Sequence, residues 1–154
     1  MWMWLLACAP ACPEGFRAEV ARTARLWTLV GRPPSGTVCY GRVEELGVLE
    51  DGGRMLLDDG RPDALLAARL VHLAMHRAEP VQGPGCEAAL LDEEARAWSE
   101  ELSLRVSLGA TDPTCAMTAA LGPTPGVEQV RDWLATSPDP LASSLRTSHT
   151  RRCR

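Results

Sequence analysis

The stretch Val71-His72-Leu73-Ala74-Met75-His76, residues 71–76, carries two of the chain's three histidines, four positions apart. Leu66, Leu70 and Leu73 repeat at helical spacing, so the pattern predicts a helix from the Arg61-Pro62 turn to about residue 78. Residues at i and i+4 of a helix lie on one face about one turn apart, which lets both imidazoles reach a single zinc ion. The stretch therefore predicts a central helix and, on it, a candidate metal site.

The same spacing occurs in the H-E-x-x-H motif of zinc proteases, where the glutamate is the general base. Leu73 stands at the position of that glutamate and cannot accept a proton. A zinc site also needs a third protein ligand, and the next predicted helix offers Asp92-Glu93-Glu94. Glu94 lies near the apolar side of that helix, whereas Asp92 points away from it. We therefore expect His72, His76 and Glu94 to hold the zinc ion, and we expect no catalytic residue.

Periodicity and turn residues predict the remaining elements. Apolar residues at helical spacing predict three further helices, at residues 14–30, 87–108 and 127–134. β-Branched and turn residues predict three strands, at residues 37–40, 46–50 and 54–58. Between the last two strands, Asp51-Gly52-Gly53 favours a tight antiparallel hairpin. We expect an α+β protein with an N-terminal helix, a small antiparallel sheet with a hairpin, two long helices and a short C-terminal helix.

Four segments of different composition follow one another along the chain. Residues 1–12 are apolar and fit a signal or lipoprotein leader, and residues 13–109 hold the long elements of a single α+β domain. Prolines and glycines interrupt residues 110–136, which are expected to be a linker with one short helix. Residues 137–154 are rich in Ser, Thr and Arg without periodicity and are expected to be disordered. His149 lies in this tail and is expected to be solvated.

The segment Leu5-Leu6-Ala7-Cys8 resembles a bacterial lipobox, in which the cysteine carries the lipid. A secretory signal also has a positively charged start, and no arginine or lysine precedes Arg17. The expectation is an exported protein, periplasmic or anchored to the outer membrane of a bacterium through lipidation of Cys8. The alternative is a cytoplasmic protein with a short apolar N-terminal tail.

The six cysteines include no C-x-x-C pair, which argues against a zinc ribbon or a thioredoxin-like redox centre. In an oxidising periplasm, two of Cys39, Cys86 and Cys115 could form a disulfide. In a cytosolic protein the same cysteines would be buried or free thiols. A further alternative pairs Cys86 with His72 or His76 as a nucleophile, because a position near a helix start favours the thiolate.

Charge and composition narrow the choice of partners. The net charge is −4, and all sixteen basic residues are arginines, scattered along the chain until its last nine residues. No basic stripe marks a nucleic-acid surface, so nucleic acid is not an expected partner. The expected partners are an unidentified protein and, through the lipid anchor, a membrane.

Over residues 36–108, the order of short strands, hairpin, two-histidine helix and acidic helix resembles the zincin metallopeptidases, especially the compact ImmA/IrrE-like group. In that group a strand edge lies beside the H-E-x-x-H helix, and a glutamate on the next helix completes the site. The resemblance implies that His72 and His76 are metal ligands and that Glu94 is the third. Because Leu73 replaces the general base, the chain is expected to be a degenerate zincin-like protein without peptidase activity.

Two alternatives to this pseudo-enzyme remain open. The first is an active zinc-dependent hydrolase whose base comes from elsewhere, for instance Glu93 or Glu94. The second is a metal-free interaction or scaffold domain, in which His72 and His76 only pack and form hydrogen bonds. The sequence indicates no substrate.

Overall fold

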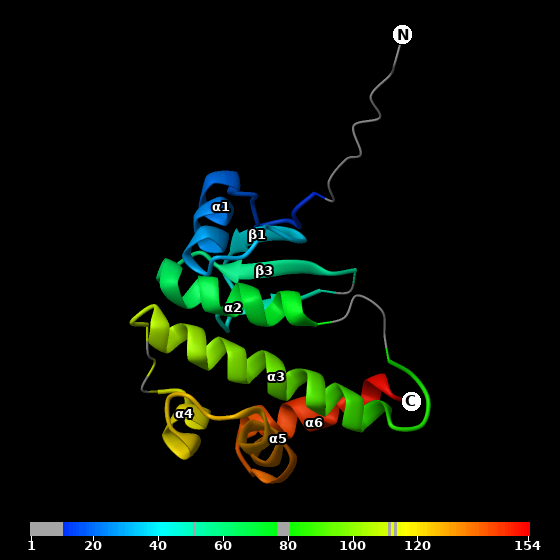
Figure 1. Ribbon diagram of the computed structural model, residues 1–154. Coiled ribbons are helices and arrows are strands. Elements are labelled where there is room, and N and C mark those ends of the chain that lie inside the picture. Colours follow the sequence, from blue (N-terminus) through cyan, green and yellow to red (C-terminus); the bar gives the residue numbers. More distant parts are fainter. Residues whose placement is uncertain (1–10, 51, 77–80, 111, 113) are drawn as a thin grey trace.

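The computed structural model describes residues 11–50, 52–76, 81–110, 112 and 114–154, and it confirms the predicted α+β class. Figure 1 shows its helices and strands in chain order. The helices within the described residues are α1 (Val20–Leu29), α2 (Asp63–Met75), α3 (Cys86–Ser107), α4 (Ala116–Leu121), α5 (Val127–Thr136) and α6 (Pro140–Arg152). The strands within them are β1 (Thr37–Gly41), β2 (Gly47–Leu49) and β3 (Arg54–Asp58).

The sheet has the strand order β1-β3-β2. β2 and β3 pair antiparallel, with Val48 opposite Leu56, which confirms the predicted hairpin. Gly52 and Gly53 in its turn have φ angles of 92° and 83°, a region that glycine enters without steric cost. β1, however, pairs parallel with β3, so the sheet is mixed and the expectation of a wholly antiparallel sheet is wrong. The Asp-Gly step determines only the local hairpin. The pairing of β1 with β3 depends instead on contacts between segments that are distant in sequence.

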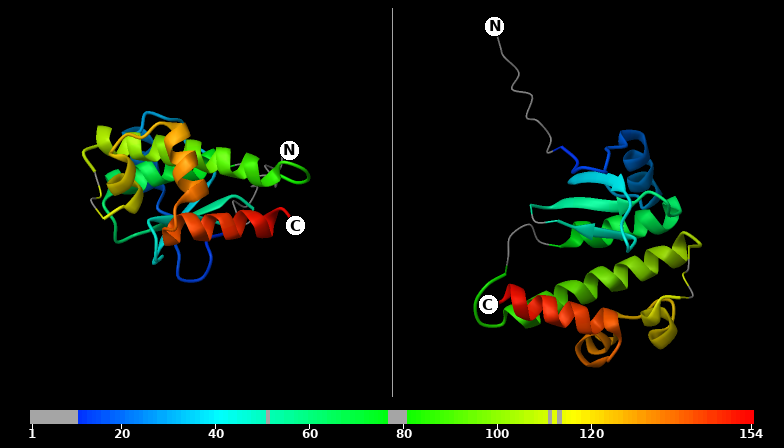
Figure 2. Two further views of the ribbon diagram at one scale, coloured as in Figure 1. Left: turned by 90° about the horizontal axis from the view of Figure 1, so that it is seen from below. Right: turned by 180° about the vertical axis from the view of Figure 1, so that it is seen from behind.

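The elements form successive layers (Figures 1 and 2). α2 lies against β2 and β3 and also against α3, and α5 and α6 pack on α3. One apolar cluster joins α1, the sheet and α2, with Leu26, Tyr40, Leu57, Leu66 and Leu70 at its centre. A second cluster joins α3 to the C-terminal helices, through Ala95, Trp98, Leu102, Met117, Val130, Leu134 and Ala142. The interface between α2 and α3 therefore separates two apolar cores.

The C-terminal part of the chain is more ordered than the sequence predicts. Residues 110–136, expected to be a linker, contain α4 and α5, and residues of both helices are buried in the second cluster. The tail from residue 137, expected to be disordered, forms α6, so that prediction is wrong. The Asp139 side chain caps α6 by accepting a hydrogen bond from the Leu141 N–H, and Pro140 occupies the first turn. These capping signals outweigh the lack of apolar periodicity.

The first helix is also shorter than predicted. The sequence predicts a helix from residue 14, whereas α1 begins at Val20. Arg17 instead pairs its backbone with Tyr40 of β1, exchanging two hydrogen bonds of 2.9 and 2.8 Å. This pairing extends the sheet and removes residues before Val20 from the helix.

Within the part of the chain that the structure describes, two disulfides join segments that are distant in sequence, Cys12 to Cys39 and Cys86 to Cys153. Cys115 is a free cysteine. Neither bond joins two of Cys39, Cys86 and Cys115, the disulfide considered for an oxidising periplasm, because the partners Cys12 and Cys153 lie in the segments 1–12 and 137–154. Cys86 cannot serve as a nucleophile while it is bonded to Cys153. Cys12 belongs to the folded part through its bond to β1.

The lipobox cysteine, Cys8, lies outside the described residues. Among the helices that are described, none combines the length and the apolar character needed to cross a bilayer.

Gly47 allows close packing between the sheet and α2. A Cβ at this position would lie 2.6 Å from the Leu57 Cδ2 and 2.9 Å from the Leu56 carbonyl oxygen of β3, and 3.2 Å from the Arg69 Cγ of α2. We expect Gly47→Ala to lower the free energy of unfolding by about 1 to 3 kcal/mol in urea titrations, because the backbone must shift. Gly60→Ala is the matched control, since its Cβ would come no closer than 3.6 Å to Asp58 Oδ1. Equal losses in the two variants would contradict the close packing at Gly47.

Candidate metal site

α2 is buried on almost every side, because its residues from Leu66 to Leu73 are all buried. Its apolar residues belong to the first cluster. Arg69, His72 and His76 follow one another at i, i+3 and i+7 and so share another face. This face contacts α3, as the ion pairs of all three side chains with α3 glutamates show. The histidine face is therefore an interface between helices.

α3 contributes the opposing charges. Glu94, Glu101 and Arg105 are separated by seven and four residues, which places them along one side of the helix, and all three are buried. Together with Arg69 and His72 they form a set of five buried charged or titratable residues between α2 and α3, which we call the charged layer. One apolar cluster lies on each side of this charged layer.

The structure brings together the three predicted metal ligands. His72 Nε2 lies 3.4 Å from Glu94 Oε1, and His76 Nε2 lies 3.3 Å from Glu94 Oε2. One potential ligand atom from each residue lies within 4.8 Å of the other two. The choice of Glu94 over Asp92 agrees with this geometry, because Asp92 instead pairs with Arg131 on the side of α5.

The two nitrogen–oxygen distances to Glu94 can be compared with those around a tetrahedral ion. Two ligands bound to zinc at about 2.0 to 2.1 Å in a tetrahedral arrangement are about 3.3 to 3.4 Å apart. Both nitrogen–oxygen distances to Glu94 have this length. They are longer than the roughly 2.7 to 2.9 Å of a charge-assisted hydrogen bond. The two distances end on different oxygens of Glu94, so a zinc ion between the rings would be held by one or both of these oxygens.

The second nitrogen of each imidazole faces another carboxylate. His72 Nδ1 lies 2.9 Å from Glu101 Oε2, a close approach of charges that is not aligned as a hydrogen bond. His76 Nδ1 lies 3.0 Å from Glu93 Oε1. Metal-binding histidines commonly have such a carboxylate behind the ring, where it fixes the tautomer and the ring orientation. Glu93 and Glu101 thus hold the outer edges of the rings.

Sequence reasoning missed Glu101 and its arginine partners. Glu101 Oε1 pairs with Arg69 Nε at 3.4 Å and with the Arg105 guanidinium. Both cations lie over the Trp98 ring, with the Arg69 Cζ 4.6 Å and the Arg105 Cζ 5.9 Å from the ring centroid. The spacing of Glu101, seven residues after Glu94, was the one available signal, because it repeats the helix face of the predicted ligand.

The electrostatics of the charged layer favour the ionised carboxylates. Burial raises the pKa of Glu94, but His72 and His76 outweigh burial and lower that pKa to about 2. Burial likewise raises the pKa of Glu101, and Arg69 and His72 lower it to about 2. Burial lowers the pKa of His72, yet the carboxylates of Glu101 and Glu94 raise it above its ordinary value. The two glutamates therefore remain charged at neutral pH.

His149, expected to be solvated, is buried with 6% of its surface exposed. It lies on the last turns of α6, which packs on α3. Burial is the largest influence on the pKa of His149 and lowers it, and the charges that act on it include Glu94 and His76. The residue therefore lies near the trio, although it is not among the three grouped ligands.

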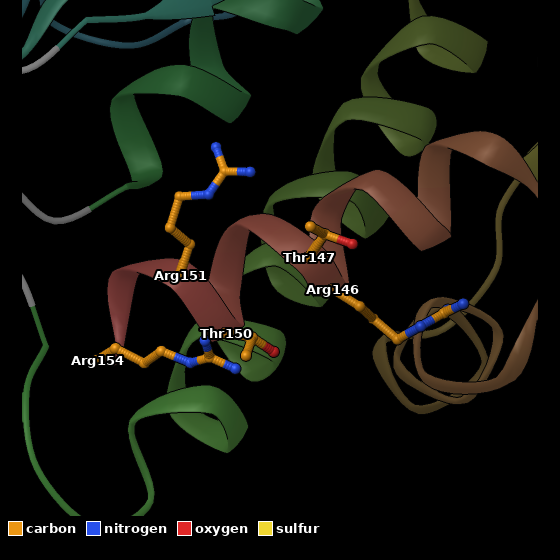
Figure 3. Close-up of a pocket in the computed structure, with 5 residues that line it drawn as sticks. All are labelled: Arg146, Thr147, Thr150, Arg151 and Arg154. Carbon is orange, nitrogen blue, oxygen red and sulfur yellow. The ribbon is translucent and has the colours of Figure 1, made fainter.

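A shallow depression lies along α6, lined by Arg146, Thr147, Thr150, Arg151 and Arg154 (Figure 3). All five residues come from this helix and its C-terminal end. Arg146 is already engaged, because its guanidinium donates to the carbonyl oxygens of Leu134 and Ser137. None of the residues expected to bind metal lines this depression, so it is separate from the candidate site.

Comparisons with known proteins gave no match for this chain among family models, curated proteins or solved structures. The zincin resemblance and the metal site therefore depend on this chain's own residues.

Acid titration of the metal-free protein tests the charged layer. The folded pKa of Glu101 is about 2, below its ordinary 4.5, so its charge stabilises the fold above about pH 4.5, and this contribution is lost as the pH falls toward 2. We expect Glu101→Gln to lower the free energy of unfolding at pH 7 by about 3 to 5 kcal/mol, because two buried arginines lose their counter-charge. The difference in the free energy of unfolding between Glu101→Gln and the parent protein should shrink as the pH falls from 4.5 to 2.

Urea unfolding at a series of pH values measures this difference. Glu44→Gln, which changes an exposed acid, serves as the control and should follow the parent at every pH. A Glu101→Gln variant as stable as the parent at pH 7 would contradict the role of Glu101 as the counter-charge.

Proposed function

We propose that the protein binds one zinc ion through His72, His76 and Glu94 and acts as a zincin-like protein without peptidase activity. The observation that carries this proposal is the position of Glu94, whose two carboxylate oxygens each approach the Nε2 of one histidine. A carboxylate behind the other edge of each ring adds support, since it would orient the imidazole toward the ion.

The chemistry of the trio favours zinc over other common divalent cations. Two imidazole nitrogens and one carboxylate match the mixed ligands that zinc prefers. Magnesium and calcium are bound mainly by oxygen ligands, six or more for calcium. Nickel and copper also bind imidazole, but zinc has no geometric preference from its d electrons and takes mixed nitrogen and oxygen ligands in a tetrahedral site.

The surroundings of the trio argue against a general base. Leu73 is 5% exposed and packs in the first apolar cluster, away from the ion. Glu93 faces the Nδ1 of His76, on the opposite edge of the ring from Glu94. Glu94 itself would be a ligand. The two bases that an active hydrolase could use are therefore poorly placed to deprotonate a zinc-bound water.

The metal-free interaction domain is a second candidate, and one observation favours it. His72 lies within ion-pair distance of both Glu94 and Glu101. A protonated His72 would balance the charge of Glu94 without a metal ion. Its raised pKa favours the protonated form. Proton and zinc are thus alternative ways to balance the charge of Glu94.

Metal analysis separates these functions. We expect the purified protein to bind one zinc per chain, with a melting temperature that rises when zinc is added to the metal-free form. His76→Ala and Glu94→Gln should each weaken zinc binding by roughly 100-fold or more in isothermal titrations, because each removes a ligand. Glu100→Gln, which changes a partly exposed acid of the same helix paired with Arg32, should bind like the parent.

Two other outcomes would decide against this function. Absence of zinc binding, together with unchanged folding of a His72→Ala/His76→Ala double variant, would favour the interaction domain. Zinc-dependent peptide hydrolysis that is lost in His72→Ala would favour the active hydrolase.

The zincin relationship and the export of the protein are parts of the same proposal. The contact of α2 with the antiparallel edge strand β2 supports the relationship, because a strand edge lies beside the histidine helix in zincins. The disulfides Cys12–Cys39 and Cys86–Cys153 support an oxidising compartment such as the periplasm. A cytoplasmic location would keep these cysteines reduced.

Lipidation at Cys8 is the final part of the proposal. Expression of the full chain in a bacterium with radiolabelled palmitate should label the parent, and Cys8→Ser should remove the label because the acceptor thiol is lost. Cys115→Ser is the matched control, since Cys115 is free of disulfides, and it should remain labelled. A parent protein that takes up no palmitate would end the lipoprotein hypothesis.

A further inference from the structure

We propose that His149 of α6 is the fourth protein ligand of the zinc ion, which makes the site closed and structural. This inference rests on the proposed zinc binding by His72, His76 and Glu94. Three protein ligands and a water are typical of catalytic zinc, whereas four protein ligands are typical of structural zinc. The identity of the fourth ligand therefore decides which kind of site this is.

The Cys86–Cys153 disulfide directs His149 toward the site. It joins the first residue of α3 to the C-cap of α6, with the two Cα atoms 5.8 Å apart. Figure 2 shows the C-terminal end of α6 beside the start of α3. His149 precedes Cys153 by four residues, so both side chains lie on one face of α6. Since Cys153 faces α3, His149 also faces α3, one turn closer to Glu94.

The His149 side chain is 6% exposed, and its ring nitrogens are not among the polar atoms that are both fully buried and without a partner. Glu94 and His76 are among the charged groups close enough to act on the ring. A zinc ion held by those two residues would therefore lie near the helix face that carries His149.

The three helices that meet at the site each contribute ligands in this arrangement. α2 provides His72 and His76, α3 provides Glu94, and α6 provides His149. The ring of His149 lies outside the compact trio, so it must turn inward when the ion binds. Such a rotation makes the imidazole a ligand and leaves no position for a water.

Cobalt substitution of the full, oxidised chain tests the fourth ligand. Cobalt(II) in a tetrahedral site gives visible absorption bands, and azide changes them only where it can replace an exchangeable ligand. We expect the parent to bind one cobalt ion with a spectrum that azide leaves unchanged. His149→Ala should still bind cobalt, about 10- to 100-fold more weakly, and its spectrum should shift with azide because water occupies the fourth position.

Ser148→Ala, which changes the exposed neighbour on α6, is the control and should match the parent. If His149→Ala does not fold, His149→Asn keeps a side chain of similar size and should show the same azide response. A parent spectrum that responds to azide as strongly as that of the variant would overturn the fourth-ligand proposal alone. A parent that binds neither zinc nor cobalt would overturn the proposed function as well.

Discussion

Burying charged side chains between two apolar cores requires each charge to meet an opposite one. An unpaired ion in such a place costs several kcal/mol, whereas a paired one roughly breaks even. In this protein the requirement acts on the charged layer between α2 and α3, where Glu101 meets Arg69 and Arg105 while Glu94 meets the histidines. A shift of α3 by one turn would separate Glu101 from Arg69. The layer thus selects the register of the two helices, while the apolar clusters supply most of the stability.

Two of the three candidate ligands, His72 and Glu94, belong to this layer, so the pairing that fixes the two helices also fixes these ligands. Glu94 is held by burial and by the two imidazoles, and the outer carboxylates limit how the rings can turn. A preorganised ligand set needs little rearrangement to accept an ion, which favours binding. The same packing also explains why the position of Leu73 is apolar: that side of α2 contacts the sheet, where a carboxylate would be buried without a counter-charge.

Local patterns predicted the elements that local forces determine. The 3.6-residue period located α2 and α3 and identified Glu94 as the acid facing the histidines, and Gly52 and Gly53 identified the hairpin. Glu101 and Arg105 were missed because a buried charge and a solvated charge look the same in a sequence. The parallel pairing of β1, the disulfides and the burial of His149 depend on contacts between distant segments. The zincin relationship stays a prediction.

The two disulfides also determine how the chain would respond to a pulling force. One encloses residues 12–39 and the other residues 86–153, so these two loops cannot lengthen while the bonds are intact. Only residues 40–85, which hold β2, β3 and α2, can be drawn out between them, to roughly 160 Å at about 3.5 Å per residue. Mechanical extension would therefore act first on the helix that carries His72 and His76, and would leave α3 to α6 as a cross-linked unit.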